Sequence, residues 1–181
     1  MRVVEYNSQR NNLKVNSLGA YSQCFSTANW MRMSHYCSAI KAGDDAALAD
    51  FLKQVETVIG PQMEHVPHPS LYFDVQQKCV TSLLNLMGVS GYDVFESKVS
   101  ISRLYELLQS GPVTVGTSKL GGLPGGHIIL AVDVDCYNDS FGDANTDYAD
   151  HNGAGVIYKP EMITPHFTGN VLYWSNKIKK G

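Results

Sequence analysis

Apolar residues recur every three or four positions in much of the chain between residues 25 and 110, which is the spacing of helices that bury one face. The clearest run begins after Asp44 and Asp45 and ends at Gly60 and Pro61. Its recurring apolar residues are Leu48, Phe51, Leu52, Val55 and Ile59. Because aspartate is a preferred N-cap and a Gly-Pro pair ends a helix, the pattern predicts one helix between these boundaries.

The same spacing predicts three further helices. One begins near Cys24 and ends at Gly43, one covers residues 74–87, and one covers residues 102–109. Three prolines lie between residues 61 and 69 and predict a loop before the third helix. The helical part of the chain therefore covers residues from about 22 to 110.

After residue 111 the helical spacing gives way to short β-rich runs separated by Gly, Asn and Asp. The runs are residues 113–117, 127–132, 155–158 and 171–174. We predict a turn at residues 137–140 and a further short strand at residues 3–6. Helices followed by strands that can pair antiparallel indicate an α+β domain, with the helical half packed on a C-terminal antiparallel sheet from about 111 to 178. A cleft is expected where the two layers meet.

The composition and charge exclude several classes of protein. The 181 residues are 44% hydrophobic and 17% charged, which suits one domain, residues 1–181, with a core that needs no disulfide or metal. A formal net charge of -3 offers no broad basic surface for nucleic acid or a membrane. No apolar run approaches the roughly 18 residues of a membrane span, and the N-terminus lacks the apolar run of a signal peptide. We expect a protein in the cytoplasm of the producing cell, with release or association with a virion as alternatives.

Four cysteines show no C-x-x-C pairing, so we interpret them as free thiols. Cys24 differs from Cys37, Cys79 and Cys136 because it stands at the predicted start of an apolar helix. The positive end of the helix dipole and the unpaired N–H groups there favour a thiolate. Cys24 is therefore a candidate nucleophile, and the other three are expected to be packing residues.

A histidine and an aspartate complete a candidate constellation. His127 follows Gly125 and Gly126 and opens the most apolar predicted strand. Asp143 lies 16 residues later (143 minus 127), on the strand expected after the turn. Two antiparallel strands joined by that turn bring Asp143 beside His127, where a carboxylate fixes the imidazole tautomer and stabilises the imidazolium.

At this point the sequence resembles the papain-like cysteine peptidases, specifically the branch of bacteriocin-leader-processing peptidases and its small phage and bacterial relatives. The matching features, which span nearly the whole chain, are residues 6–12, the Cys24 helix, residues 111–116, residues 125–127 and residues 142–143. The resemblance implies a papain-like fold. Phe25 departs from the family pattern, because many relatives carry a small residue after the nucleophile.

The resemblance also implies a role for each site residue. Cys24 attacks an amide carbonyl to form an acyl-enzyme thioester, His127 accepts and later returns the proton, and Asp143 orients His127. The family uses an upstream glutamine as oxyanion donor. We assign this role to Gln9, with Gln23 as the alternative, because a side chain immediately before the nucleophile tends to point away from it.

The predicted function is a cysteine peptidase or amide hydrolase without a cofactor, acting on a peptide or a peptidoglycan stem, with a bacteriophage endopeptidase as the setting to test first. One alternative is a transglutaminase-like acyl transferase, which uses the same Cys, His, Asp order. Another is a non-catalytic virion or binding module that keeps the fold, an interpretation that the bulk of Phe25 favours.

Two possible metal sites are not expected to bind metal. The acidic run after Asp143 carries Tyr148 and Ala154 where a calcium loop requires glycine and glutamate. Pro67 separates His65 from His68 and precludes the helical spacing that aims two imidazoles at one ion. We therefore predict no metal.

Overall fold

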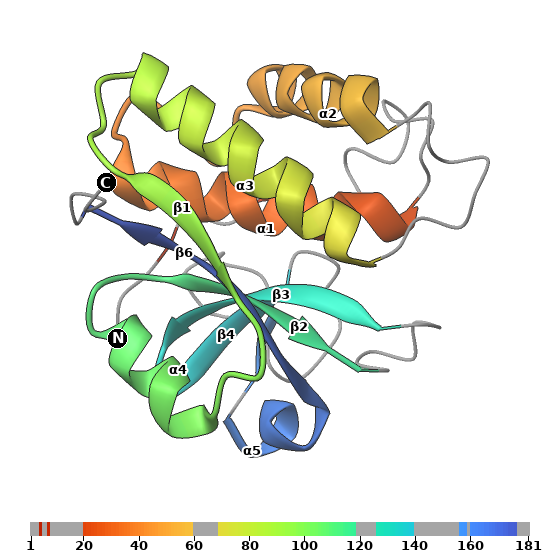
Figure 1. Cartoon of the computed structure of the whole chain (residues 1–181), viewed down its shortest axis with the longest axis vertical. Helices are drawn as coiled ribbons and strands as arrows, with labels where there is room; N and C mark the ends of the chain where they lie inside the picture. The colour runs from red at the N-terminus through yellow and green to blue at the C-terminus, as the bar shows by residue number, and fades with distance from the viewer. Residues whose placement is uncertain are drawn as a thin grey trace.

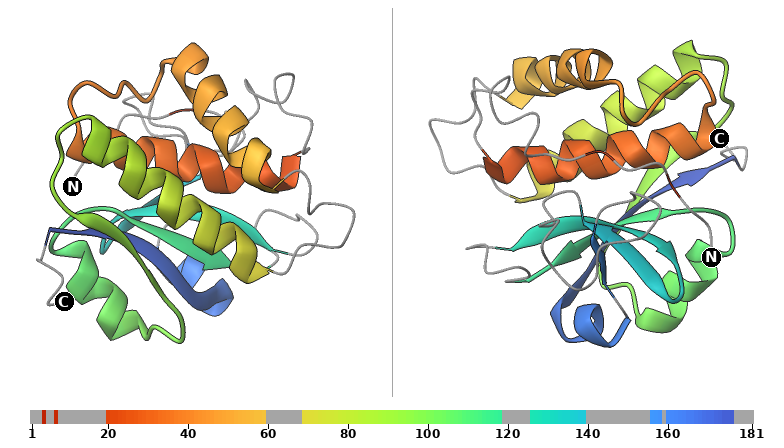
Figure 2. Two further views of the ribbon diagram at one scale, coloured as in Figure 1. Left: turned by 45° about the horizontal axis from the view of Figure 1, so that its top comes forward. Right: turned by 180° about the vertical axis from the view of Figure 1, so that it is seen from behind.

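An antiparallel β-sheet separates two layers of helices in the computed structural model of the chain (Figure 1). The structure describes residues 4, 7, 20–59, 69–118, 126–139, 156–158 and 160–176. The helices in this part of the chain are α1 (Ala20–Tyr36), α2 (Asp45–Ile59), α3 (Pro69–Leu86), α4 (Ile101–Leu108) and the short α5 (Pro160–Ile163). Helices α1 to α3 lie on one side of the sheet, and α4 and α5 lie on the other (Figures 1 and 2).

Six strands form the sheet within the described residues, in the order β1-β6-β2-β3-β4-β5. They are β1 (Tyr92–Glu96), β2 (Val113–Thr117), β3 (His127–Asp133), β4 (Cys136–Asp139), β5 (Val156–Tyr158) and β6 (Phe167–Ser175). All five pairings between neighbouring strands are antiparallel. The expected mixture of helices and an antiparallel sheet is therefore confirmed.

Elements with strong local signals form where the sequence predicts them. Helix α2 begins directly after Asp44, whose Oδ1 accepts a hydrogen bond from the backbone N–H of Ala47 at 3.1 Å. Helix α4 is capped by Ser100, whose hydroxyl oxygen accepts from the N–H of Arg103 at 3.1 Å. Strand β2 has the bounds that its apolar run predicts.

The first and third helices have other bounds than predicted. Helix α1 begins four residues before Cys24 and ends at Tyr36 rather than at Gly43. The chain then folds back, and the carbonyl of Lys41 accepts a hydrogen bond from the Trp30 indole at 3.2 Å. Helix α3 begins at Pro69 rather than at residue 74, since a proline is tolerated in the first turn of a helix.

Two strands were not anticipated correctly. The turn predicted at residues 137–140 is wrong, because residues 136–139 form β4 and the turn lies at Val134 and Asp135. Asp133 Oδ1 accepts from the N–H of Val134 at 2.7 Å, which closes this tighter turn. Strand β1 was not predicted at all and is the sheet edge, although it comes from the helical half of the sequence. Of the strand predicted at residues 3–6, only Val4 is described, and it is buried outside any strand.

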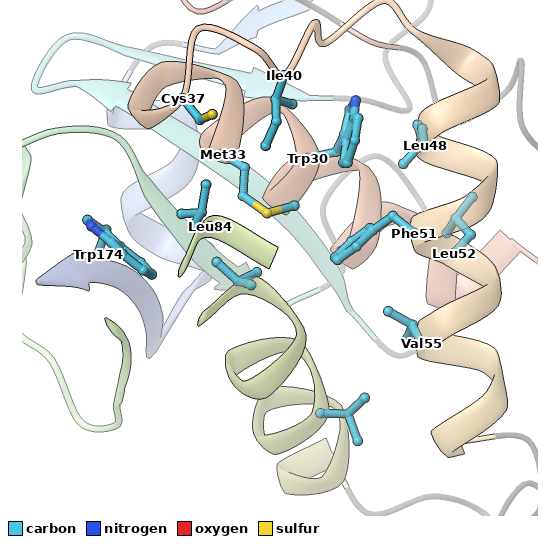
Figure 3. Close-up of a cluster of buried hydrophobic side chains, with 12 residues drawn as sticks. Trp30, Met33, Cys37, Ile40, Leu48, Phe51, Leu52, Val55, Leu84 and Trp174 are labelled. Carbon is cyan, nitrogen blue, oxygen red and sulfur yellow. The ribbon is translucent and has the colours of Figure 1, made fainter. Parts of the chain in front are cut away.

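The largest core cluster joins the three-helix layer to the end of β6 (Figure 3). Trp30 of α1 lies 5.7 Å from Phe51 of α2, measured between ring centroids. The buried members are Trp30, Met33, Cys37, Ile40, Leu48, Phe51, Leu52, Val55, Val75, Val80, Leu84 and Trp174. The apolar stripe predicted for α2 therefore packs against α1 and α3.

Candidate active site

Cys24 lies in the second turn of α1 rather than at its start, because the helix begins at Ala20. Its side chain is only 6% exposed. Residues three and four apart share a helix face, so Cys24 lies on the same stripe as Ala28 and Met31. Ala28 and Met31 pack against Leu130 of β3, so Cys24 faces the sheet.

Helix α1 runs along β3 in the same direction. Phe25 packs in a cluster that Ile128 joins, and Met31, further along the helix, packs with Val132, further along the strand. Figures 1 and 2 show the first turns of α1 and the beginning of β3 at the same end of the molecule. Cys24, in the second turn of α1, and His127, the first residue of β3, thus lie toward the same end of two elements that pack together.

His127 is the first residue of β3 and is 3% exposed. Its ladder partner is Thr117, whose hydroxyl donates to the carbonyl of His127 at 2.9 Å. Gly126 has φ +108, and a Cβ there would lie 2.8 Å from the Thr117 carbonyl oxygen. The glycine before His127 is therefore required by the backbone that leads into the strand.

The alternation of side chains along β3 determines the face of the sheet from which the His127 side chain extends. Ile128 and Leu130 pack on the α1 side, whereas Ile129 packs in the cluster on the α4 side. The His127 side chain therefore extends from the α4 face of the sheet. Phe167, which pairs with the same Thr117 from β6, packs against the cluster on that face. The stripe of α1 that carries Cys24 lies on the other side of the sheet, so His127 begins on the opposite face from the candidate nucleophile.

Phe25, the residue after the candidate nucleophile, packs against side chains of α3 and the sheet. Its ring lies 4.8 Å from Phe73 of α3, in an edge-on contact, and belongs to a cluster with Leu172. The aromatic side chain is buried between α1, α3 and the sheet. Its bulk is used in packing.

The remaining predicted site residues are not described. Asp143 and Gln9 lie outside the described residues, and so does the side chain of Gln23. The corrected turn makes Asp139 the acidic residue of β4, a position that the sequence had assigned to the turn. Asn138, the residue before Asp139, pairs with Leu130 of β3.

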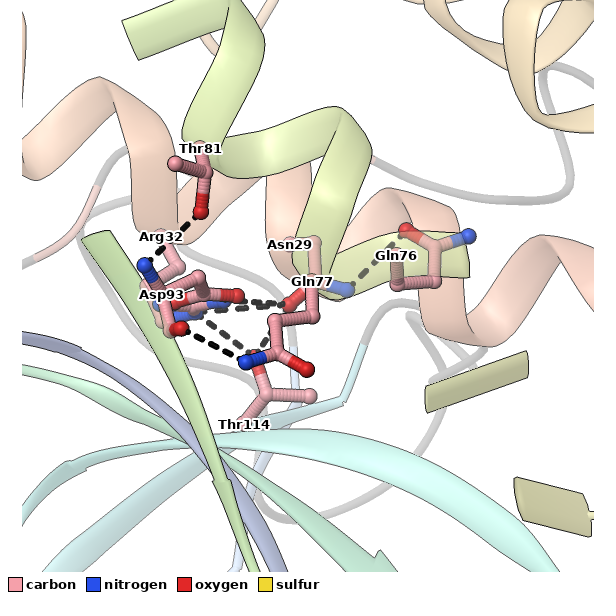
Figure 4. A network of polar contacts seen from close by, with 7 residues as sticks. All are labelled: Asn29, Arg32, Gln76, Gln77, Thr81, Asp93 and Thr114. Atoms are coloured by element: carbon pink, nitrogen blue, oxygen red, sulfur yellow. Dashed lines mark hydrogen bonds and ion pairs between the residues drawn. The ribbon is translucent and has the colours of Figure 1, made fainter. Parts of the chain in front are cut away.

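A buried polar network, absent from the sequence prediction, links α1 to α3, β1 and β2 (Figure 4). Arg32 of α1 forms two hydrogen-bonded contacts with Asp93 of β1, at 2.6 and 2.8 Å, and neither side chain is exposed. Burial raises the pKa of Asp93 above its ordinary value, and the Arg32 guanidinium opposes this shift. Arginine and aspartate are rarely buried unless they are paired. Their 61-residue separation gives no local pattern from which the contact is foreseeable.

Two of the other thiols have the properties of packing residues. Burial raises the pKa of Cys136 to about 11, and nearby Asp135 and Asp133 add to the shift. Burial also raises the pKa of Cys79. A thiol that stays protonated is a poor nucleophile, as the sequence analysis expects for these positions.

The described ranges contain no group of three or more His, Cys, Asp or Glu side chains that could hold a metal ion. None of the helices in these ranges is long and apolar enough to cross a membrane. No protein-family model matches the chain, and neither a curated protein nor a solved structure gives a match. The function is therefore argued from the site alone.

Proposed function

We propose that this chain is a papain-like cysteine peptidase or amide hydrolase with Cys24 as nucleophile. The observation that carries the proposal is the packing of α1 along β3 in the same direction, with Cys24 and His127 near the two starts. A thiol on the sheet-facing stripe of a helix and an imidazole at the end of the adjoining strand are the two groups that nucleophilic amide cleavage needs.

In the proposed mechanism the Cys24 sulfur attacks the amide carbonyl carbon while His127 takes the thiol proton. The tetrahedral intermediate collapses to a thioester, and the leaving amine departs with the proton that His127 returns. Water then attacks the thioester with His127 as base, and the acid product and free thiol are released. Asp143 orients the imidazole, and Gln9, or alternatively Gln23, donates a hydrogen bond to the oxyanion.

Asn7, two residues before Gln9 in the sequence, contacts the segment between α1 and α2. The side-chain amide of Asn7 donates to the carbonyl of Ala42 and, at 3.2 Å, to a carboxylate oxygen of Asp45. Ala42 packs in the same cluster as Ala28, one helical turn after Cys24.

The proposed substrate is a peptide or a peptidoglycan stem, and the first setting to test is a bacteriophage endopeptidase made in the host cytoplasm and then released or carried on the virion. The proposal includes no cofactor, no nucleic-acid partner and no membrane partner. Hydrolysis of a bacterial wall preparation and of unfolded peptides, compared side by side, distinguishes the two substrate classes.

The decisive experiment compares Cys24→Ala with Cys37→Ala, because both thiols are buried residues of the same stretch of chain. We expect Cys24→Ala to reduce hydrolysis to background and Cys37→Ala to retain it, with activity dependent on a reducing agent. An iodoacetamide-treated enzyme should carry the label on Cys24 in proportion to the activity lost. Full activity of Cys24→Ala contradicts the proposal.

The orienting carboxylate is tested by Asp143→Asn beside Asp139→Asn. Loss of this group in a triad lowers kcat by up to about 10⁴, because the imidazole then adopts the wrong tautomer. We expect this loss for Asp143→Asn. The same loss for Asp139→Asn alone assigns the role to the residue at the end of β4 instead.

A non-catalytic virion or binding module is the second candidate, and the start of His127 on the α4 side favours it. In that case Cys24 reacts no faster with thiol reagents than the other three cysteines, and Cys24→Ala leaves binding intact. A transglutaminase-like transferase is recognised by acyl transfer to an added primary amine that exceeds hydrolysis.

A further inference from the structure

Helix α1 is buried on all sides near the candidate nucleophile. Every residue from 24 to 33 is buried, whereas a helix at a protein surface buries only one stripe. Apolar residues therefore surround the helix axis, with Phe25, Ala28 and Trp30 packed in three different clusters. Hydrophobic burial alone then favours no single rotation of α1 about its axis.

The polar residues of α1 do select one rotation. Arg32 donates through both terminal nitrogens to Asp93 on β1, and through Nε to the hydroxyl of Thr114 on β2 at 3.0 Å (Figure 4). The Thr114 hydroxyl donates to Asn29 Oδ1 at 2.7 Å, and this oxygen also accepts from Arg32 at 3.0 Å. One side of α1 is thus tied to two strands by groups that water cannot satisfy.

The same network extends toward the start of the helix. Asn29 donates to the side-chain carbonyl of Gln76 on α3 at 3.1 Å, and the Gln76 amide donates to the hydroxyl of Ser26 at 2.7 Å. Ser26 is two residues after Cys24. The chain of contacts therefore fixes both the middle of α1 and the turn that carries the candidate nucleophile.

We propose that Arg32 and Asn29 are positioning residues that set the rotation of α1 and so direct Cys24 toward the start of β3. A slip of the helix by one residue position turns it by about 100° and removes Cys24 from the stripe that faces β3. In some other proteins, buried polar groups select one packing arrangement of helices that apolar contacts alone leave undetermined. The inference deepens the proposed function and rests on it.

The test exchanges the buried ion pair for apolar residues of similar size. The double variant Arg32→Met with Asp93→Leu removes both charges, and such exchanges often leave stability unchanged or improve it. The matched control is Arg103→Met with Glu96→Leu, an ion pair of 3.1 Å between partly exposed side chains away from α1. We expect both double variants to unfold cooperatively. The Arg32/Asp93 double variant should lose about 100-fold in kcat with little change in KM, because a misplacement of a reacting group by about 1 Å costs about this factor. The control double variant should keep its kcat.

A second readout does not depend on catalysis. In the ¹H–¹⁵N spectrum we expect the α1 amides of the Arg32/Asp93 double variant to split or broaden, while the wild type and the control show one set. A folded double variant with wild-type kcat and one set of α1 resonances overturns the inference. If the wild type itself hydrolyses nothing, the proposed function fails, and the spectrum alone decides on the positioning role.

A double variant that does not fold is replaced by Thr114→Val. This change keeps the shape of the side chain and removes one acceptor for Arg32 and one donor to Asn29. A smaller loss of kcat, about tenfold, is expected, with the same splitting of the α1 resonances. Unchanged kcat and an unchanged spectrum in Thr114→Val again overturn the inference.

Discussion

The hydroxyl of Tyr137 lies in the core on the α4 side of the sheet, and no hydrogen-bond partner for it occurs in the described part of the chain. A buried polar group without a partner has lost its hydration without replacement, which costs free energy in the folded state. Burial, with smaller contributions from Tyr105 and Cys136, raises the pKa of the Tyr137 phenol to about 12. Between about pH 10 and about pH 12 the side chain therefore stays neutral in the fold, whereas it ionises in the unfolded chain.

Tyr137→Phe should raise the free energy of unfolding by about 1 kcal/mol, measured by urea denaturation at pH 7, because it removes only the unpaired hydroxyl. The pH dependence should change as well. With an unfolded pKa of about 10, the wild type loses no stability through this group below pH 10, and it loses stability as the pH rises through about 12, because the unfolded chain releases the proton more readily. The variant should therefore lose less stability than the wild type in this range.

Tyr173→Phe is the matched control for this prediction. Burial also raises the pKa of Tyr173 to about 12, but its hydroxyl bonds to Glu96, so removing it breaks a hydrogen bond. This variant should be no more stable than the wild type at pH 7. Stabilisation of similar size in both variants contradicts the assignment of the Tyr137 gain to a missing partner.

Substitution of Asp93 should lower stability, in contrast to Tyr137→Phe, because it leaves the charge of Arg32 buried without a partner. Asp93→Asn should lower the free energy of unfolding by about 3 to 5 kcal/mol, since the Arg32 charge is then buried without compensation. Glu96→Gln, which also neutralises the partner of an arginine, should cost under about 1 kcal/mol because that pair is half exposed. Urea denaturation of both variants measures the difference, and equal losses contradict it.

At the scale of elements, the sequence predicts the helices and strands that carry local signals and misses a strand that depends on long-range contacts. Helices α2 and α4 and strand β2 carry their own caps, stops or apolar runs, and their positions are predicted. Strand β1 depends on contacts with α1 and β6, far away in the sequence, and is missed.

The candidate site divides in the same way. Cys24 and His127 are candidates because a helix pattern and a Gly-Gly-His strand surround them locally. Arg32 and Asp93 are not found, because only the tertiary fold brings them together. The position of Asp139 was assigned wrongly, since Asn and Asp favour turns and here extend a strand paired on both sides.

The cap of α2 gives the element-scale prediction. Asp44→Ala should lower the free energy of unfolding by about 1 kcal/mol, because the N–H of Ala47 loses its acceptor and the helix dipole loses a favourable charge. Asp50→Ala, on the exposed middle of the same helix, removes the same charge without a cap. Its effect should lie within about 0.5 kcal/mol of zero, and a loss equal to that of Asp44→Ala contradicts the capping role.

At the scale of the whole molecule, one sheet carries a core on each face. The α4-side cluster contains Leu104 and Ile129, and the clusters on the other face contain Leu130 and the two tryptophans, Trp30 and Trp174. Neighbouring residues of β3 thus belong to opposite cores. Loss of either core exposes the shared sheet, so the two layers are expected to unfold together as the single domain that the sequence predicts.

This cooperativity can be measured because both tryptophans lie on the side away from α4. Leu104→Ala removes a fully buried side chain from the α4 side and should lower the free energy of unfolding by about 2 to 5 kcal/mol. Tryptophan fluorescence and far-ultraviolet circular dichroism should report the same reduced urea midpoint. Leu52→Ala, equally buried on the helix side, should behave alike in both signals. If Leu104→Ala shifts the dichroism transition and leaves the fluorescence transition in place, the two layers unfold separately and the chain is not one cooperative domain.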